Sequence, residues 1–178
     1  MKISRAAAGS LLFFVVAPGV VAGLLPWWLT GWQARDLPSY WVPVRVLGVA
    51  LVMAGMVVLV HAFARFVMEG RGTPAPVAPT DRLVIGGLYR HVRNPMYVAV
   101  LAVILGQALL LGRPVLLPYA AAVFVAVASF VRWYEEPTLA KQFGRDYERY
   151  RAAVPGWWPR LRPWRPDQAP SAGSSRST

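Results

Sequence analysis

The sequence predicts an all-α protein: an integral membrane bundle of four transmembrane helices with a C-terminal cytoplasmic amphipathic helix. Hydrophobic residues make up 56% of the 178-residue chain, above the roughly 45–50% that is typical of soluble domains. They gather into four blocks of about the length that a bilayer requires. Charged residues, 15% of the chain, cluster between and after these blocks.

The first block predicts a span over residues 9–29. Basic residues precede it, as they precede the core of a signal peptide, but it exceeds the roughly 7–15 apolar residues of such a core. A group of tryptophans marks its far end as a membrane–water interface: Trp27, Trp28 and Trp32. Gly19 and Gly23 form a GxxxG pattern, which favours close helix packing.

The second block predicts a span over residues 44–67. At its end, His61, Arg65 and Glu69 are spaced four residues apart and therefore share one helix face. Two interpretations stay open. These side chains lie at the membrane interface, with Arg65 extending toward water, or they line a polar cavity.

The third and fourth blocks predict spans over residues 96–111 and 115–131, joined by the tight turn Gly112–Pro114. Such a short link makes the two spans a helical hairpin. The polar stretch before the hairpin begins with a Pro-rich and Gly-rich segment, residues 70–79, that cannot form a regular helix.

The region after the fourth span predicts an amphipathic cytoplasmic helix over residues 132–153, ended by Pro155. Its apolar positions share one face: Leu139, Phe143, Tyr147 and Tyr150. Residues 1–165 therefore form one membrane domain. Residues 166–178 are rich in Pro, Ser and Gly and predict a disordered tail.

The basic residues predict the orientation in the membrane. With both termini cytoplasmic, only three of the 19 lysines and arginines fall outside: Arg35, Arg45 and Arg113. The positive-inside rule selects this topology, and we expect it in the plasma membrane of a bacterium. The net charge of +11 then faces anionic lipids rather than nucleic acid. Because the chain has no cysteine and no HExxH pattern, no metal site is expected.

Polar residues gather at the cytoplasmic ends of the hairpin. Those before the third span are Tyr89, Arg90, His91, Arg93 and Asn94, and those after the fourth are Glu135 and Glu136. Because the hairpin turn is tight, the two groups should be neighbours. One interpretation is a salt-bridge network that only clamps the hairpin; the other is a binding site for a ligand with charges of both signs.

Three stretches resemble one family of membrane enzymes. Residues 87–97, Gly-Leu-Tyr-Arg-His-Val-Arg-Asn-Pro-Met-Tyr, resemble the Gly-x-Tyr-x-x-x-Arg-His-Pro-x-Tyr motif of the isoprenylcysteine carboxyl methyltransferase and phospholipid methyltransferase superfamily. Residues 135–150 resemble its Glu-Glu-x-x-Leu-x-x-x-Phe-Gly-x-x-Tyr-x-x-Tyr motif, and residues 154–160 resemble its Val-Pro-Arg-Trp-x-Pro ending. The resemblance covers about residues 82–160.

This resemblance implies an S-adenosylmethionine-dependent methyltransferase with a lipid or lipophilic acceptor, either like an isoprenylcysteine carboxylate or a phospholipid amine. It implies a catalytic pair, Arg93 and Glu136. The residues that it implies for cofactor binding are Tyr89, Arg93, Asn94, Pro95, Tyr97, Glu135 and Glu136. Asn94 stands where the family has histidine, and asparagine can bind a ligand but cannot exchange a proton with it.

Two other functions remain as alternatives. A sterol-reductase-like oxidoreductase using NADPH resembles the same C-terminal architecture, but the four predicted spans and the Glu-Glu pair favour methyl transfer. A non-enzymatic scaffold or transport subunit would need neither Arg93 nor the two carboxylates. Titration with S-adenosylmethionine and with NADPH distinguishes the three.

Overall fold

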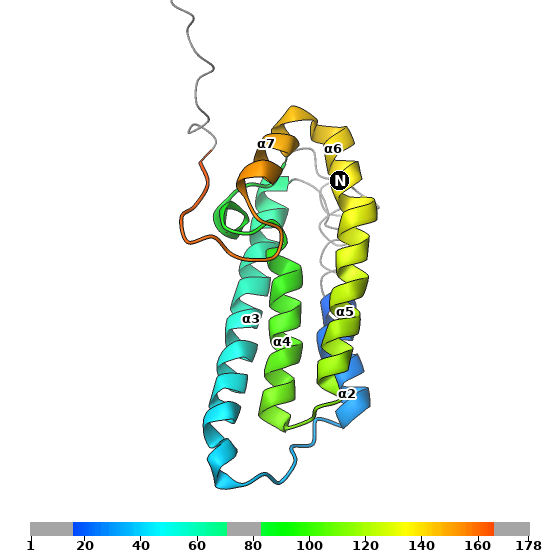
Figure 1. The fold of residues 1–178 in the computed structure, drawn as a ribbon, viewed down its shortest axis with the longest axis vertical. Coiled ribbons are helices and arrows are strands. Elements are labelled where there is room, and N and C mark those ends of the chain that lie inside the picture. The colour runs from blue at the N-terminus through cyan, green and yellow to red at the C-terminus, as the bar shows by residue number, and fades with distance from the viewer. Residues whose placement is uncertain (1–15, 71–82, 166–178) are drawn as a thin grey trace, which may run out of the picture.

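The computed structural model describes residues 16–70 and 83–165, and these residues are helical or irregular, with no strand. Helices α3 (Val42–Gly70), α4 (Pro95–Leu111) and α5 (Leu116–Phe130) stand side by side (Figure 1). The short α2 (Leu25–Thr30) lies next to the beginning of α5, and α6 (Glu136–Phe143) continues α5 (Figure 1). The all-α prediction is confirmed for this part of the chain. The predicted tail, residues 166–178, lies outside it.

The first apolar helix spans Val16–Thr30 and changes its winding midway. A π-helical turn, η1 (Val20–Leu24), leads into α2 (Leu25–Thr30). Pro26 stands at the start of α2 and has no backbone N–H to donate. The turn before it widens to i→i+5 hydrogen bonds, which is a common way to accommodate a local break in a helix.

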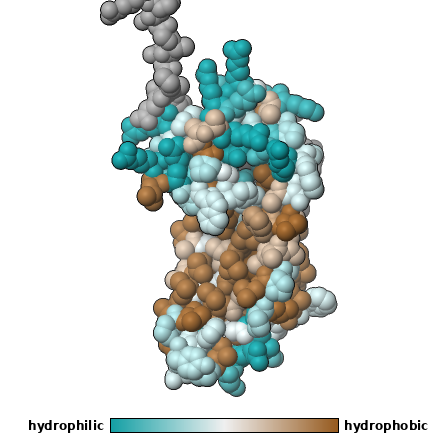
Figure 2. All heavy atoms as spheres, in the orientation of Figure 1, coloured by the Kyte–Doolittle hydropathy of each residue, from teal (hydrophilic) through white to brown (hydrophobic). Residues whose placement is uncertain are grey.

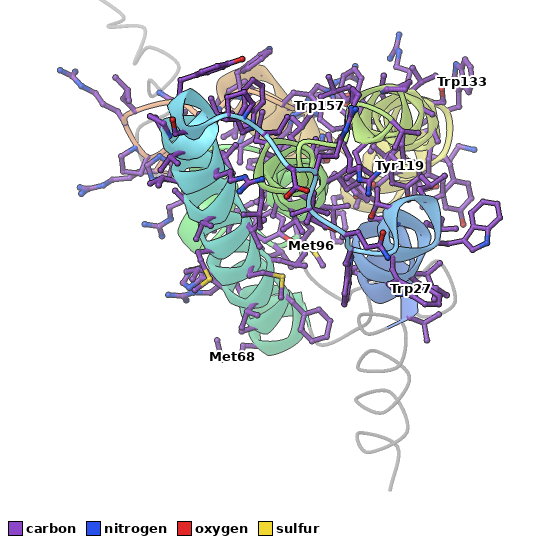
Figure 3. All side chains as sticks on the ribbon, turned by 90° about the horizontal axis from the view of Figure 1, so that it is seen from below. Trp27, Met68, Met96, Tyr119, Trp133 and Trp157 are labelled. Atoms are coloured by element: carbon purple, nitrogen blue, oxygen red, sulfur yellow. The ribbon has the colours of Figure 1, made fainter. Side chains whose placement is uncertain are left out.

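The wide turn leaves two carbonyl groups, those of Val21 and Ala22, without their usual helical donors. The N–H groups one turn later are redirected or, at Pro26, missing. Side chains replace them: Tyr119 Oη donates to Val21 O at 2.6 Å, and Gln107 Nε2 donates to Ala22 O at 2.7 Å. Figure 3 shows Tyr119 lying between the helices. These bonds fasten the first helix to α4 and α5.

Helices α3 (Val42–Gly70) and α4 (Pro95–Leu111) approach each other through glycines. A Cβ atom on Gly48 would lie 2.6 Å from the Leu110 amide nitrogen, and one on Gly106 would lie 2.8 Å from Gly48 O. Any side chain at either position would force the helices apart. Small residues at helix interfaces allow this close packing in membrane proteins.

The GxxxG pattern of Gly19 and Gly23 has a different outcome. Neither glycine has a described atom within 4 Å of an added Cβ, so this pattern does not mark a packed contact between described helices. The close contact lies instead between α3 and α4, at Gly48 and Gly55 of α3 and Gly106 of α4. The apolar core of the helices is one cluster of buried residues: Ala22, Leu59, Ala99, Val100, Val103, Ile104, Ala108, Leu116 and Ala120.

The hairpin turn lies where the sequence predicts it, with α4 ending at Leu111 and Gly112 in the left-handed region at φ 64°. After it, α5 (Leu116–Phe130), the π-helical turn η4 (Val131–Glu135) and α6 (Glu136–Phe143) form one continuous helix.

The prediction of one helix over residues 132–153 is wrong. Its first part continues α5 through η4, and the helix breaks at Gly144, where φ is 50° and ψ is −125°. Glycine adopts this backbone conformation without strain. A separate helix, α7 (Arg145–Ala153), follows. The predicted apolar face still gathers into one cluster, in which Tyr147 and Tyr150 are buried.

The surface is divided into an apolar body and a polar cap. Figure 2 shows hydrophobic residues around the body and hydrophilic residues over the end that carries α6 and α7. Two described helices are long and apolar enough to cross a membrane, Ser39–Arg65 and Leu116–Phe143, and two apolar helices are shorter, Val16–Thr30 and Pro95–Leu111.

Candidate functional site

The segment after α7, residues 154–164, runs back along residues 90–94 at the start of α4; we call it the strap. Four backbone hydrogen bonds join the two segments: Arg93 N to Pro155 O (2.9 Å), Asn94 N to Gly156 O (3.2 Å), Arg160 N to His91 O (3.0 Å) and Trp164 N to Arg90 O (3.0 Å). The strap thereby holds the predicted site residues of this segment in one fixed conformation.

The side chain of Arg93 is fixed by three groups from different parts of the polar cap. Its Nε donates to Val154 O in the strap at 3.0 Å. Its Nη1 donates to Glu136 Oε1 at 2.8 Å and to Tyr147 Oη at 3.3 Å. Burial, and then the nearby Glu136 carboxylate, raises the pKa of Tyr147, so its phenol stays neutral. The guanidinium group is therefore held in place, with Nη2 left on its open side.

Glu136 is a buried carboxylate neutralised by three arginines. Its oxygens lie 2.8 Å from Arg93, 3.0 Å from Arg151 and 3.7 Å from Arg132, and only 10% of its side chain is exposed. The cluster ties α4, α6 and α7 together at one point. Glu136 does not line the cavity described next, so its contact with any ligand there would be indirect.

A cavity of about 200 Å³ opens between the first helix, α4 and α5, at the boundary of polar cap and apolar body. Six of the seven residues predicted to bind the cofactor line it: Tyr89, Arg93, Asn94, Pro95, Tyr97 and Glu135. The remaining lining is apolar: Ala17, Pro18, Val21, Leu59, Met96, Val100 and Val127. The cavity thus has a charged end and a hydrocarbon end.

Glu135 differs from its neighbour Glu136 in its partners. It points into the cavity, where the Tyr97 hydroxyl donates to its Oε2 at 3.2 Å. Among the described residues, no lysine or arginine makes an ion pair with Glu135. It is therefore the carboxylate that can attract a cationic ligand in the cavity.

Asn94 and Arg93 offer hydrogen-bond donors to the same part of the cavity. Asn94 is 7% exposed, and its side chain bonds to no other group in the described part of the chain. A Cβ atom on Gly156 would lie 3.2 Å from Arg93 Nη2 and 3.5 Å from Asn94 Nδ2. Glycine at this position therefore keeps the space beside both donors open. The Asn94 amide, at the cavity wall, can therefore offer its donor and its acceptor to a ligand.

Three further residues of the site were not assigned a role from sequence. Tyr147 and Arg151 hold Arg93 and Glu136, and Trp157 of the strap packs on Tyr97, with ring centroids 6.5 Å apart, and edge-on against Phe124 at 5.1 Å. Trp157 lies in residues 154–160, which resemble the ending of the family motif, but that resemblance did not indicate which residues Trp157 contacts. No sequence signal distinguished Arg151 from the neighbouring arginines.

The remaining polar candidates lie outside the cavity. His91 Nδ1 is 2.8 Å from Arg160 O, so its ring is used by the strap. His61 and Arg65 lie beside Gly87, where a Cβ atom would be 3.2 Å and 3.3 Å from them. Neither of them lines this cavity, and the described residues hold no His, Cys, Asp and Glu cluster suited to a metal ion.

Comparison with known proteins gives one family. The sequence model of a family described as phospholipid methyltransferase (PEMT) matches residues 43–146, which is more than half of the chain and includes α3, α4, α5 and α6. No curated protein matches the chain in sequence. The matched region contains both hairpin ends that carry the candidate site. The chain therefore belongs to the phospholipid methyltransferase family, within the superfamily of integral membrane methyltransferases.

Proposed function

We propose that this chain is an S-adenosylmethionine-dependent methyltransferase of the membrane. It transfers a methyl group to a lipid or lipophilic acceptor, such as an isoprenylcysteine carboxylate or a phospholipid amine. The cavity carries this proposal, because its charged end is built from the two motif segments and its other end is apolar. Membership of the family supports methyl transfer to a lipid in general.

The donor groups of the cavity fit the cofactor. S-adenosylmethionine carries a carboxylate, two cationic groups and a flat purine. Arg93 Nη2 and the unpartnered Asn94 amide, kept accessible by Gly156, would hold the carboxylate. Glu135 would hold a cationic group, and the rings of Tyr89 and Tyr97 would take flat or cationic parts.

Arg93 and Glu136 would act as a unit in catalysis. When bound, the cofactor supplies an electrophilic methyl group on a sulfonium. Arg93 touches the ligand and fixes its orientation, which is a large part of what an enzyme contributes to a two-substrate reaction. Glu136 keeps the guanidinium aimed at the cavity. The apolar lining excludes water and favours transfer to an anionic acceptor such as a carboxylate, because the charges of the sulfonium and of the acceptor are neutralised in that step.

The proposal includes a topology. Residues 1–165 form one domain with four spans and both termini in the cytoplasm, so that the polar cap and the cavity mouth face the cofactor pool. The Arg35, Arg45 and Arg113 side chains lie at the opposite end, where Arg113 Nε donates to Gln33 O. Because the chain has no native cysteine, single cysteines at Pro38 and Arg113 can be labelled from outside intact cells. Labelling of either from the inside alone would contradict this topology.

Calorimetry on the purified protein in detergent tests the cofactor. We expect binding of S-adenosylmethionine and of its demethylated product. Glu135→Gln should weaken this binding, whereas Glu148→Gln, on the exposed side of α7, is the matched control and should not. Folded protein that bound neither compound would refute the proposal, and binding of NADPH alone would favour the reductase. Transfer of a labelled methyl group in membranes then identifies the acceptor.

A further inference from the structure

We propose that Pro137 is a positioning residue, which turns both adjacent carboxylates toward the interior by forcing a wide helical turn. Pro137 has no N–H, and in an α-helix its ring would collide with the carbonyl four residues earlier, that of Trp133. The helix avoids this collision through the π-helical turn η4 (Val131–Glu135), in which the Glu136 N–H donates to Val131 O, five residues back.

The direction of the two carboxylates follows from the winding of this turn. Val131 faces the interior and is 4% exposed, so it marks the inward direction. In an α-helix of about 100° per residue, Glu135 would stand about 40° and Glu136 about 140° from that direction. Glu136 would then point away from Arg93. With i→i+5 bonding, the helix turns by roughly 80° per residue. Glu135 and Glu136 then lie about 40° on either side of the inward direction that Val131 marks.

The observed contacts agree with the second geometry. Glu135 lines the cavity and Glu136 bonds Arg93 at 2.8 Å, so both neighbours face inward from consecutive positions. A regular α-helix that keeps Val131 facing inward and all the residues between cannot place Glu135 and Glu136 in this way. The role of Glu135 toward the cofactor rests on the proposed function, but the placement of Glu136 against Arg93 does not.

Pro137→Ala tests the inference, because alanine restores the N–H and favours a regular helix. We expect the affinity for S-adenosylmethionine to fall about tenfold or more, as after the loss of one charged hydrogen bond. Pro118→Ala is the matched control, since Pro118 is exposed in the first turn of α5, and it should leave the affinity unchanged.

A compensating deletion shows whether winding is the cause. Trp133 is 78% exposed and points away from the bundle (Figure 3). Deleting Trp133 from the Pro137→Ala variant leaves four residues between Phe130 and Glu136, and these can form an ordinary α-helix. Glu135 and Glu136 then stand about 60° and 40° on either side of the inward direction. We expect this double variant to regain affinity to within about threefold of the wild type.

A cofactor-free measurement separates this inference from the proposed function. The coupling of Arg93 and Glu136 in thermal unfolding, measured with Arg93→Ala and Glu136→Gln, should be present in the wild type, lost in Pro137→Ala and regained in the double variant. This pattern without any cofactor binding would refute the function and keep the inference. Unchanged coupling in Pro137→Ala, or no recovery in the double variant, would overturn the inference. If Pro137→Ala does not fold, the double variant alone decides.

Discussion

Two wide turns, each followed by a proline, lie in opposite environments of this molecule. Turn η1 precedes Pro26 within the apolar body, and its freed carbonyls accept bonds from Tyr119 and Gln107 of other helices. Turn η4 precedes Pro137 at the polar cap. By the same count, the carbonyls freed there are those of Arg132 and Trp133, which are exposed residues. The next carbonyl, that of Tyr134, accepts a bond from the exposed Thr138 hydroxyl of its own helix, at 2.6 Å.

The difference shows how the surroundings decide what a helix irregularity does. In an apolar region an unpaired carbonyl is costly, so side chains from neighbouring helices must donate hydrogen bonds to it. The turn is thereby joined to those helices. Near water the solvent can serve the carbonyls, and the turn needs no partners from other helices. It is then free to set the direction of side chains, as η4 does for Glu135 and Glu136.

We expect the largest loss of stability from removing the hydrogen bonds that join η1 to α4 and α5. A double variant, Gln107→Leu with Tyr119→Phe, leaves both freed carbonyls unpaired in the apolar body. We expect it to lower the free energy of unfolding by about 3 kcal/mol, from the cost of leaving buried acceptors without donors. Chemical unfolding in detergent measures this. A loss below about 1 kcal/mol would show that the carbonyls need no side-chain donors.

Near η4, we expect a substitution to weaken cofactor binding more than it lowers stability. Arg93→Ala should weaken S-adenosylmethionine binding by about 1.5–3 kcal/mol. The unfolding of the cofactor-free protein should change less, because Arg132 and Arg151 still neutralise Glu136. Calorimetry and thermal unfolding on the same preparation compare the two effects. An equal loss in both would return Arg93 to a purely structural role.

Tyr119→Phe alone should have a smaller effect than the double variant. It removes the donor to Val21 O and keeps the ring in place, and side-chain bonds inside membrane proteins contribute about 0.6 kcal/mol on average. We expect a loss of about 1 kcal/mol in unfolding and unchanged cofactor affinity. A change in affinity would indicate that the cavity, which Val21 lines, depends on this bond.

The smallest effect is expected at Thr138. Thr138→Val removes the hydroxyl that bonds Tyr134 O and keeps the shape of the side chain. Since this position is exposed, water can replace the hydroxyl, and the loss should stay within about 0.5 kcal/mol. A loss as large as that of Tyr119→Phe would remove the contrast between the two turns.

The sequence carried enough information for the all-α class and the hairpin, because long apolar blocks and the turn at Gly112 are local signals. The same locality explains the errors. An apolar pattern with helical spacing continues across Gly144, so the break there was invisible until its backbone conformation was known. GxxxG is a pattern within one helix, whereas the contact of Gly48 and Gly106 joins two.

The sequence predicted which residues belong to the candidate site, but it did not predict how their side chains are arranged. The motif residues before α4 and after α5 do gather at one cavity. That Glu136 is turned to Arg93 and away from the cavity depends on the extra residue in η4, which a pattern read at ordinary helical spacing cannot reveal. The strap bonds join residues 90–94 to residues 154–164, and no local pattern encodes a pairing over such a separation.

The strap also has a consequence for the order of events during synthesis. Residues 154–164 leave the ribosome after every described helix, yet their carbonyls fix Arg93 and Asn94. The helices can therefore insert into the membrane before the backbone at the start of α4 has its partners. A nascent chain that is already inserted would lack a formed cavity until these residues arrive. Under the proposed function, cofactor binding would then begin only once translation has passed the strap.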